Sequence, residues 1–254
     1  MVPRESSERV NVALRIGDAS VPLEMDVPAR PVKLRRMLPV IRQMSNSFIS
    51  SGVEQLTAAG SEISCRAGCG ACCRQIVPVS EAEAFDLRGL LDEMPEERRS
   101  AVAERFSEGM ERLNSNGYFE RLAEAASASD DRYDEAVREY FRFGIPCPFL
   151  EDESCSIHDS RPITCREYLV TSPPENCASA EGEGVANVRH FFQVKEALIS
   201  LSQDKTRPEL PYIPMIAVMD WTDKHSDDSR ELTGREWARE FFDSLARFSR
   251  PPGD

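Results

Sequence analysis

The sequence has little positive charge and no long hydrophobic run. In 254 residues, 44 acidic side chains outnumber 31 basic ones, which gives a net charge of −13. Such a chain is poorly suited to binding a phosphate backbone. No apolar run approaches the roughly 20 residues of a membrane helix, and the polar residues 1–11 lack the apolar stretch of a secretory signal. We therefore expect a cytoplasmic protein with neither nucleic acid nor a membrane as partner.

Histidine and tryptophan are scarce, with three and two residues, whereas cysteine is prominent. The eight cysteines are still too few for a small secreted disulfide scaffold, in which roughly 8–10% of residues are cysteine. Four of them fall within nine residues, from Cys65 to Cys73. In a reducing cytosol, such crowding indicates metal binding or redox chemistry before disulfides.

The spacing of apolar residues predicts a mainly α protein with a small N-terminal β-hairpin and two converging cysteine-rich loops. Residues 10–27 alternate with period two around a four-residue turn, 17–20. Pro39 either limits the first helix to a start near residue 38 or kinks it, and Ser80 with Glu83 forms a capping box that opens the second. One short predicted helix begins at residue 81. The other predicted helices cover residues 34–56, 96–113, 118–127, 131–143, 188–202 and 232–248.

These patterns divide the chain into three predicted parts. Residues 1–30 form a hairpin extension, residues 31–205 a helical metal-binding domain that carries the cysteines, and residues 206–254 a C-terminal helical appendage. Residues 144–180 differ from the rest because they are rich in proline and show little periodicity.

The first cysteine group has the sequence Cys65-Arg-Ala-Gly-Cys69-Gly-Ala-Cys72-Cys73. Cysteines two residues apart suit one metal ion, because a tight turn points both sulfurs inward. Gly68 and Gly70 offer the positive φ angles of such a turn. Neighbouring Cys72 and Cys73 project in different directions, so one of them serves a second metal or packs structurally.

The second group contains Cys147, Cys155, Cys165 and Cys177 in the proline-rich loop. Because the first group offers only about three sulfurs to one centre, a four-coordinate site needs a ligand from this loop. Eight thiols are enough for two four-ligand sites, or for one cluster with spare cysteines.

The combined pattern CxxxCGxCC, CPFL, CxIH and RPxxCRxY, followed by a last cysteine, resembles the YkgJ-type cysteine-cluster proteins over residues 65–177. That family is described as a zinc- or iron-chelating domain. The resemblance implies metal binding, and a relative with a similar cysteine motif, the flagellin lysine-N-methylase, implies an iron–sulfur cluster working with S-adenosylmethionine. The implied ligands are Cys65, Cys69, Cys72, Cys73, Cys147, Cys155, Cys165 and Cys177.

Other side chains near these cysteines have structural as well as functional interpretations. His158 follows Cys155 at a usable ligand spacing, but we favour a loop histidine bonded to Asp159 or to the backbone. Arg161 and Arg166 flank Cys165. They could offset thiolate charge or hold a carboxylate, or they could pair with the nearby Glu151, Asp152, Glu153 or Glu167, and these roles are compatible. We expect Tyr168 to pack, and the other two histidines to be structural.

The sequence favours a metal centre and leaves its chemistry open. An iron–sulfur cluster, with the four-iron form favoured, is slightly ahead of zinc because the thiols exceed what one zinc ion needs. Such a centre suits methyl or electron transfer on a small-molecule or protein substrate. The alternatives are a non-enzymatic zinc-stapled scaffold and a redox or metal-delivery protein. The spacing of Cys65, Cys69 and Cys72 also occurs in radical S-adenosylmethionine enzymes, but the expected α/β barrel pattern is missing.

Overall fold

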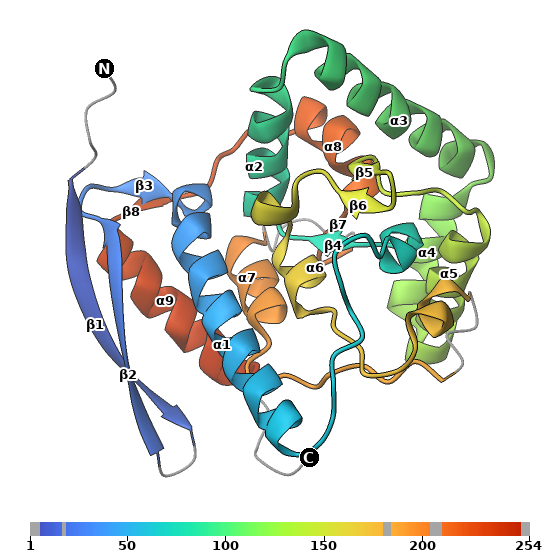
Figure 1. Ribbon diagram of the computed structural model, residues 1–254. Coiled ribbons are helices and arrows are strands. Elements are labelled where there is room, and N and C mark those ends of the chain that lie inside the picture. Colours follow the sequence, from blue (N-terminus) through green and yellow to red (C-terminus); the bar gives the residue numbers. More distant parts are fainter. Residues whose placement is uncertain (1–5, 17–18, 180–183, 204–209, 250–254) are drawn as a thin grey trace.

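The computed structural model describes residues 6–16, 19–179, 184–203 and 210–249. Helices dominate this part of the chain, and strands occur only in two-stranded pairs. The long N-terminal hairpin lies at one side of the molecule next to α1 and α9, and the loops around β5 and β6 lie below helix α3 in the other half (Figure 1). The predicted fold class, mainly α with a small hairpin, is confirmed.

The hairpin consists of β1 (Ser7–Ile16) and β2 (Ala19–Pro28), which pair in antiparallel register. Val10, Met25 and Val27 are buried, as the alternation predicts for the face turned toward the core. The predicted four-residue turn is wrong, because Ile16 already pairs with Ala19. The two residues of the connection, 17–18, lie outside the described residues.

Helix α1 (Leu38–Ala58) follows a 3₁₀ turn, η1 (Leu34–Met37), and begins where Pro39 predicts. The next helices are α2 (Glu81–Asp92), α3 (Glu96–Ser115), α4 (Tyr118–Ala128) and α5 (Asp130–Arg142). Their predicted positions are confirmed, and the Ser80–Glu83 capping box is present at the start of α2.

The later helices are predicted less well. Helix α7 (Val194–Ser202) begins six residues after the expected start, because the segment before it pairs with the loop after Cys165: the Val188 N–H donates to the Leu169 carbonyl at 2.8 Å. The short helix α8 (Val218–Lys224) is not predicted at all. Helix α9 (Gly234–Arg247) lies where expected. Part of the predicted connection at 207–214 lies outside the described residues.

Two apolar cores hold these elements together. The first joins α2, α3, α4 and α5 to α8 and to the strand pair β4 (Pro78–Val79) and β7 (Ile213–Pro214). The second joins the hairpin to α1, α7 and α9, with β3 (Val32–Lys33) paired to β8 (Glu231–Leu232) at its edge. Helix α2 contributes to both, since Leu87 lies in the first core and Ala82 in the second. The predicted domain boundaries remain a prediction.

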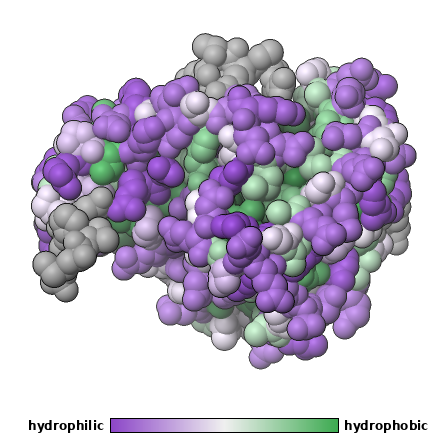
Figure 2. All heavy atoms as spheres, turned by 90° about the horizontal axis from the view of Figure 1, so that it is seen from above, coloured by the Kyte–Doolittle hydropathy of each residue, from purple (hydrophilic) through white to green (hydrophobic). Residues whose placement is uncertain are grey.

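The surface is mostly hydrophilic in the view from above, with apolar side chains showing in small groups between polar ones (Figure 2). None of the helices in the described part of the chain combines the length and the apolar character needed to cross a lipid bilayer.

Candidate metal centre

The eight cysteines come from two stretches of chain that the fold brings together, and we call them the cysteine centre. All eight are free thiols. Cys177 is buried and the other seven are half-buried. The centre consists of Cys65, Cys69, Cys72, Cys73, Cys147, Cys155, Cys165 and Cys177.

The first stretch folds as a turn followed by a short 3₁₀ helix, η2 (Ala71–Arg74). Gly68 has a φ of +80°, as predicted for the turn. Gly70 does not, because its φ is −93°. Its small size serves another purpose: a Cβ on Gly70 would lie 2.8 Å from Leu150 Cδ1 and 3.2 Å from the carbonyl oxygen of Glu153. Glycine at this position lets the two cysteine stretches approach closely.

The second stretch begins with a small hairpin, β5 (Leu150–Glu151) and β6 (Ser154–Cys155). The turn residues Asp152 and Glu153 both have positive φ, at 49° and 56°, which is the backbone of a tight two-residue hairpin turn. Glu153 pairs with Arg74 of η2. This ion pair holds the hairpin tip against the first cysteine stretch.

Backbone hydrogen bonds join the two stretches directly. The Cys147 N–H donates to the carbonyl oxygen of Cys73 at 2.6 Å, and the Ser64 N–H donates to that of Val170 at 2.9 Å. On another side, η2 contacts η4 (Pro174–Ala178), the 3₁₀ helix that carries Cys177. Convergence of the two loops is therefore a property of the backbone.

Helix α6 (Ile163–Glu167) carries Cys165 and is anchored to α2. The buried Glu83 accepts the Ile163 N–H at 2.8 Å while its other oxygen closes the capping box with Ser80. Thr164 Oγ1 donates to the carbonyl oxygen of Pro78 at 2.6 Å. Sequence reasoning found the capping box but missed this second role of Glu83, because the partner lies far away in the chain.

Electrostatic interactions connect the thiols through Cys72. Cys65 and Cys177 both interact with Cys72 and with Cys69. Three cysteines of the second stretch also interact with Cys72, namely Cys147, Cys155 and Cys165. The Cys72 thiol is also hydrogen-bonded to that of Cys73. One side chain thus has electrostatic contact with cysteines from both stretches.

Burial keeps most of these thiols protonated in the absence of metal. It raises the pKa of Cys147 to about 12 and that of Cys165 well above its usual value. The pKa of Cys72 is raised first by its hydrogen bond to Cys73 and then by burial. Because a bound metal needs thiolates, its binding to such thiols releases protons.

The donor set fits zinc or iron in its chemistry. Thiolate sulfur is a preferred ligand for both metals, and the thiols lie in a single connected group. Within the residues that the structure describes, no three His, Cys, Asp or Glu side chains already stand as a set of metal ligands. Metal binding therefore requires the thiols to turn toward a common point.

Arg161 supplies positive charge at the cysteine centre. It interacts electrostatically with Cys65, Cys72 and Cys155. Its Nη1 contacts His158 Nε2 at 2.8 Å, whereas its buried Nε has no hydrogen-bond partner among the described residues. Three of the acidic residues considered as partners are engaged elsewhere, since Glu151 and Glu153 pair with other arginines and Glu167 caps α7. Of the two roles considered for Arg161, the structure favours charge compensation.

Arg166 interacts electrostatically with Cys155 as well, but its hydrogen bonds give it a structural role. It is buried, donates from Nη1 to Asn46 Oδ1 of α1 at 2.9 Å, and donates from Nε to the carbonyl oxygen of Arg161 at 3.0 Å. Burial lowers its pKa, and the positive charges of Arg42 and Arg161 lower it further. Arg166 thus fixes the loop of Arg161 against α1.

The remaining candidates take the structural places expected for them. His158 lies near Asp159, with 3.6 Å between Nδ1 and Oδ1, and its side chain is largely exposed. His190 contacts the carbonyl oxygen of Glu167, and His225 that of Trp221. Tyr168 is hydrogen-bonded to the Cys177 thiol and accepts a hydrogen bond from Gln75. The tyrosine therefore packs beside the cysteine centre, and Gln75 is a supporting residue that sequence reasoning missed.

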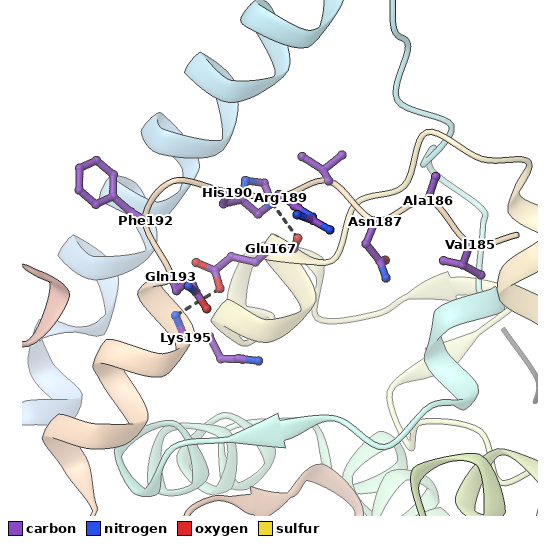
Figure 3. A pocket seen from close by; sticks show the side chains of 10 residues that line it. Glu167, Val185, Ala186, Asn187, Arg189, His190, Phe192, Gln193 and Lys195 are labelled. Carbon is purple, nitrogen blue, oxygen red and sulfur yellow. Dashed lines mark hydrogen bonds between the residues drawn. The ribbon is translucent and has the colours of Figure 1, made fainter. Parts of the chain in front are cut away.

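A polar pocket of about 750 Å³ opens beside α6. Figure 3 shows the Glu167 side chain pointing toward Gln193 and Lys195 at the start of α7. Its two carboxylate oxygens accept the backbone N–H groups of Val194 and Lys195, at 2.7 and 3.2 Å. Burial raises the pKa of Glu167 to about 7. Because the carboxylate already caps α7, we regard it as part of the fold.

The cysteine pattern matches the model of one known protein family. Residues 64–183 match the family model "CxxCxxCC: Putative zinc- or iron-chelating domain". This match supports a cysteine-cluster family for the segment. The matched range includes all eight cysteines, both backbone links between the two stretches, and Arg161. No curated protein and no solved structure matches the chain significantly.

Proposed function

We propose that the protein binds zinc or iron through the cysteine centre. The observation that carries this proposal is that backbone hydrogen bonds bring the two cysteine stretches together, with Cys72 near six other thiols. Buried thiols alone would pack without this grouping. The positive charge of Arg161 beside them is what a negatively charged metal–thiolate centre needs.

One form of this centre is an iron–sulfur cluster. The number of thiols, larger than a single zinc ion uses, supports it. The half-buried state of seven cysteines also leaves the centre within reach of a small molecule. In this form the cluster would supply electron transfer, or methyl transfer with S-adenosylmethionine as donor, and the four-iron type is favoured.

The other form is a closed zinc site in a non-enzymatic scaffold or interaction protein. None of the cysteines lines any of the three described pockets, and this supports a closed site. A structural zinc site closes all four coordination positions, whereas a catalytic one keeps a position open. The metal would then act by tying the two cysteine stretches together. Both forms need cysteines that are not oxidised to disulfides, which favours a reducing compartment such as the cytoplasm.

The test is the element-resolved metal-to-protein ratio of protein purified without oxygen. About four irons per chain would support the cluster form, and zinc without iron would support the closed site. His158→Ala is the control, because its ring contacts Arg161 and Asp159 and we expect the variant to keep its metal. Wild-type protein that takes up neither metal, even after reconstitution under reducing conditions, would contradict the proposal.

A further inference from the structure

A cavity of about 670 Å³ lies beside α8, away from the cysteine centre, and we call it the α8 pocket. Its walls are formed by α8, the C-terminal end of α3, the start of α4 and the residues around β7. The volume is within the range of about 300–1,000 Å³ that small-molecule sites have. None of the eight cysteines lines it. The lining includes Phe119, Glu120, Tyr212, Asp220, Trp221 and Lys224.

The greater part of the wall is apolar, and three elements contribute aromatic rings to it. Phe119 comes from α4, Tyr212 from the segment before β7, and Trp221 from α8. Two of the rings are held by contacts of their own. The Tyr212 hydroxyl lies 2.5 Å from that of Tyr133, and the Trp221 ring is stacked on His225 with 4.4 Å between the centroids. Such a wall can receive the apolar body of a ligand without first being ordered by it.

The elements around the pocket are packed firmly against one another. Helix α8 continues from the 3₁₀ turn η5 (Met215–Ala217), which lies close to α3. A Cβ on Gly109 of α3 would meet Ile216 Cδ1 of this turn at 2.6 Å. On the other side, β7 is paired with β4. The cavity is therefore a built part of the fold.

The polar groups of the pocket are mostly acceptors. Asp220 is half-buried and Glu120 is exposed, and within the part of the chain that the structure describes neither carboxylate has a hydrogen bond or an ion pair. Lys224 is the only lysine or arginine among the described lining residues, and it pairs with neither of them. His225 Nδ1 lies 2.7 Å from the Trp221 carbonyl oxygen, which can only accept, so the neutral ring offers Nε2 as a further acceptor.

We propose that the α8 pocket binds a small organic amine, with the apolar body against the aromatic wall and the ammonium group toward Asp220 and Glu120. An ammonium group donates three hydrogen bonds and carries the positive charge that the two carboxylates lack. The rings of Trp221 and Tyr212 add attraction for a cation that lies over them. An anionic ligand would instead meet two unpaired negative charges. Because no cysteine lines the pocket, this inference does not depend on metal binding.

The test compares three molecules that share one apolar body in calorimetric titrations of the full-length protein. The molecules are phenethylamine, its neutral analogue 2-phenylethanol, and the anionic 3-phenylpropionate. We expect one phenethylamine to bind per chain, at least about 10-fold more tightly than the alcohol, and we expect no binding of 3-phenylpropionate. Added salt should weaken the binding of phenethylamine, because the charges that attract it are in contact with solvent.

Helix α4 supplies a matched pair of variants. Glu120 and Glu124 stand one turn apart and are both exposed, but only Glu120 lines the pocket. Asp220→Asn should weaken phenethylamine binding by about 10-fold, and Glu120→Gln should weaken it less because this carboxylate is exposed. Glu124→Gln should bind as wild type does.

The wild-type titrations decide the question even if a variant fails to fold. Phenethylamine binding weaker than about 10 mM would overturn the proposal, as would binding no tighter than that of the alcohol or of 3-phenylpropionate. Unchanged affinity in folded Asp220→Asn would also overturn it. None of these outcomes bears on metal binding at the cysteine centre.

Discussion

The backbone N–H of Cys147 donates to the carbonyl oxygen of Cys73 at 2.6 Å. This bond joins the two cysteine stretches without using either thiol, so both sulfurs stay available to a metal. It also fixes the position of Cys147 relative to Cys73. The close approach beside it depends on Gly70, whose missing side chain admits Leu150 and Glu153.

Gly70→Ala should therefore weaken both the fold and metal binding. The added Cβ would lie 2.8 Å from Leu150 Cδ1 and 3.2 Å from the Glu153 carbonyl oxygen, so the β5–β6 hairpin must move outward. We expect a loss of about 1–3 kcal/mol in the free energy of unfolding, as for other overpacked sites. Urea denaturation and a chelator competition for zinc would measure the two effects.

Gly52→Ala is the matched control. Gly52 lies inside α1, and a Cβ there meets nothing within 4 Å. Alanine should raise helix stability by about 0.5–1 kcal/mol and leave zinc affinity unchanged. If both variants bound zinc as tightly as wild type, contact between the stretches would not control the cysteine centre.

Local sequence patterns were sufficient for helices α1 to α5 and α9 and for the strand pairing of the N-terminal hairpin, but not for its turn or for α8. Ser80 and Glu83 stand three residues apart before an apolar run, so the capping box could be predicted from sequence spacing alone. The start of α7 could not, because it depends on Glu167, a residue far back in the chain, accepting the Val194 N–H. A periodic pattern reports which face of a segment is apolar, whereas the residue at which a helix begins depends on tertiary partners.

The same limit applies to the cysteine centre. The eight cysteines and the convergence of their loops followed from spacing and resemblance. The contacts that join the loops did not, because they depend on η2 contacting η4 and accepting the Cys147 N–H. The roles of Arg161 and Arg166 also needed the structure, since only their different partners separate two arginines close together in the sequence.

Glu83→Ala should cost more stability than an ordinary cap deletion. Its carboxylate is buried, caps α2 and accepts the Ile163 N–H, so its removal leaves two segments with unpaired buried groups. We expect a loss of about 3 kcal/mol. Hydrogen exchange should show faster opening of α6, which carries Cys165, together with the start of α2.

A second capping box in the same chain is the control for Glu83. Thr233 and Glu236 form it at the start of α9, where it is exposed and the Glu236 carboxylate accepts hydrogen bonds from Thr233. Glu236→Ala should cause a smaller loss of stability and no change at α6. Equal losses in the two variants would mean that the bond to Ile163 adds nothing.

Gly234→Ala should separate α9 from the N-terminal hairpin. A Cβ at this position would lie 2.5 Å from Val27 Cβ and 2.7 Å from the carbonyl oxygen of Pro28, and backbone atoms cannot rotate away as a side chain does. We expect a loss of about 3 kcal/mol in the free energy of unfolding. Gly89→Ala in α2, where a Cβ meets nothing within 4 Å, should show no such loss in the same denaturation experiment.

Arg161→Met should lower metal affinity with little effect on the stability of the metal-free protein. The guanidinium interacts with three thiols of the cysteine centre, and its buried Nε has no partner among the described residues, so its charge matters most when those thiols become thiolates. Residues that support metal ligands typically change affinity by about 10–100-fold. We expect a loss near the lower figure in a competition with a chromophoric zinc chelator, and a partial recovery in Arg161→Lys.

Arg138→Met provides the comparison, because Arg138 pairs with Glu135 on the surface of α5. This variant should bind zinc as wild type does. A merely structural role for Arg161 predicts the opposite pattern, in which the metal-free protein loses stability and zinc affinity falls only in proportion to the unfolded fraction. Thermal unfolding of both variants with and without zinc separates the two cases, since only charge compensation makes the loss specific to the metal-bound state.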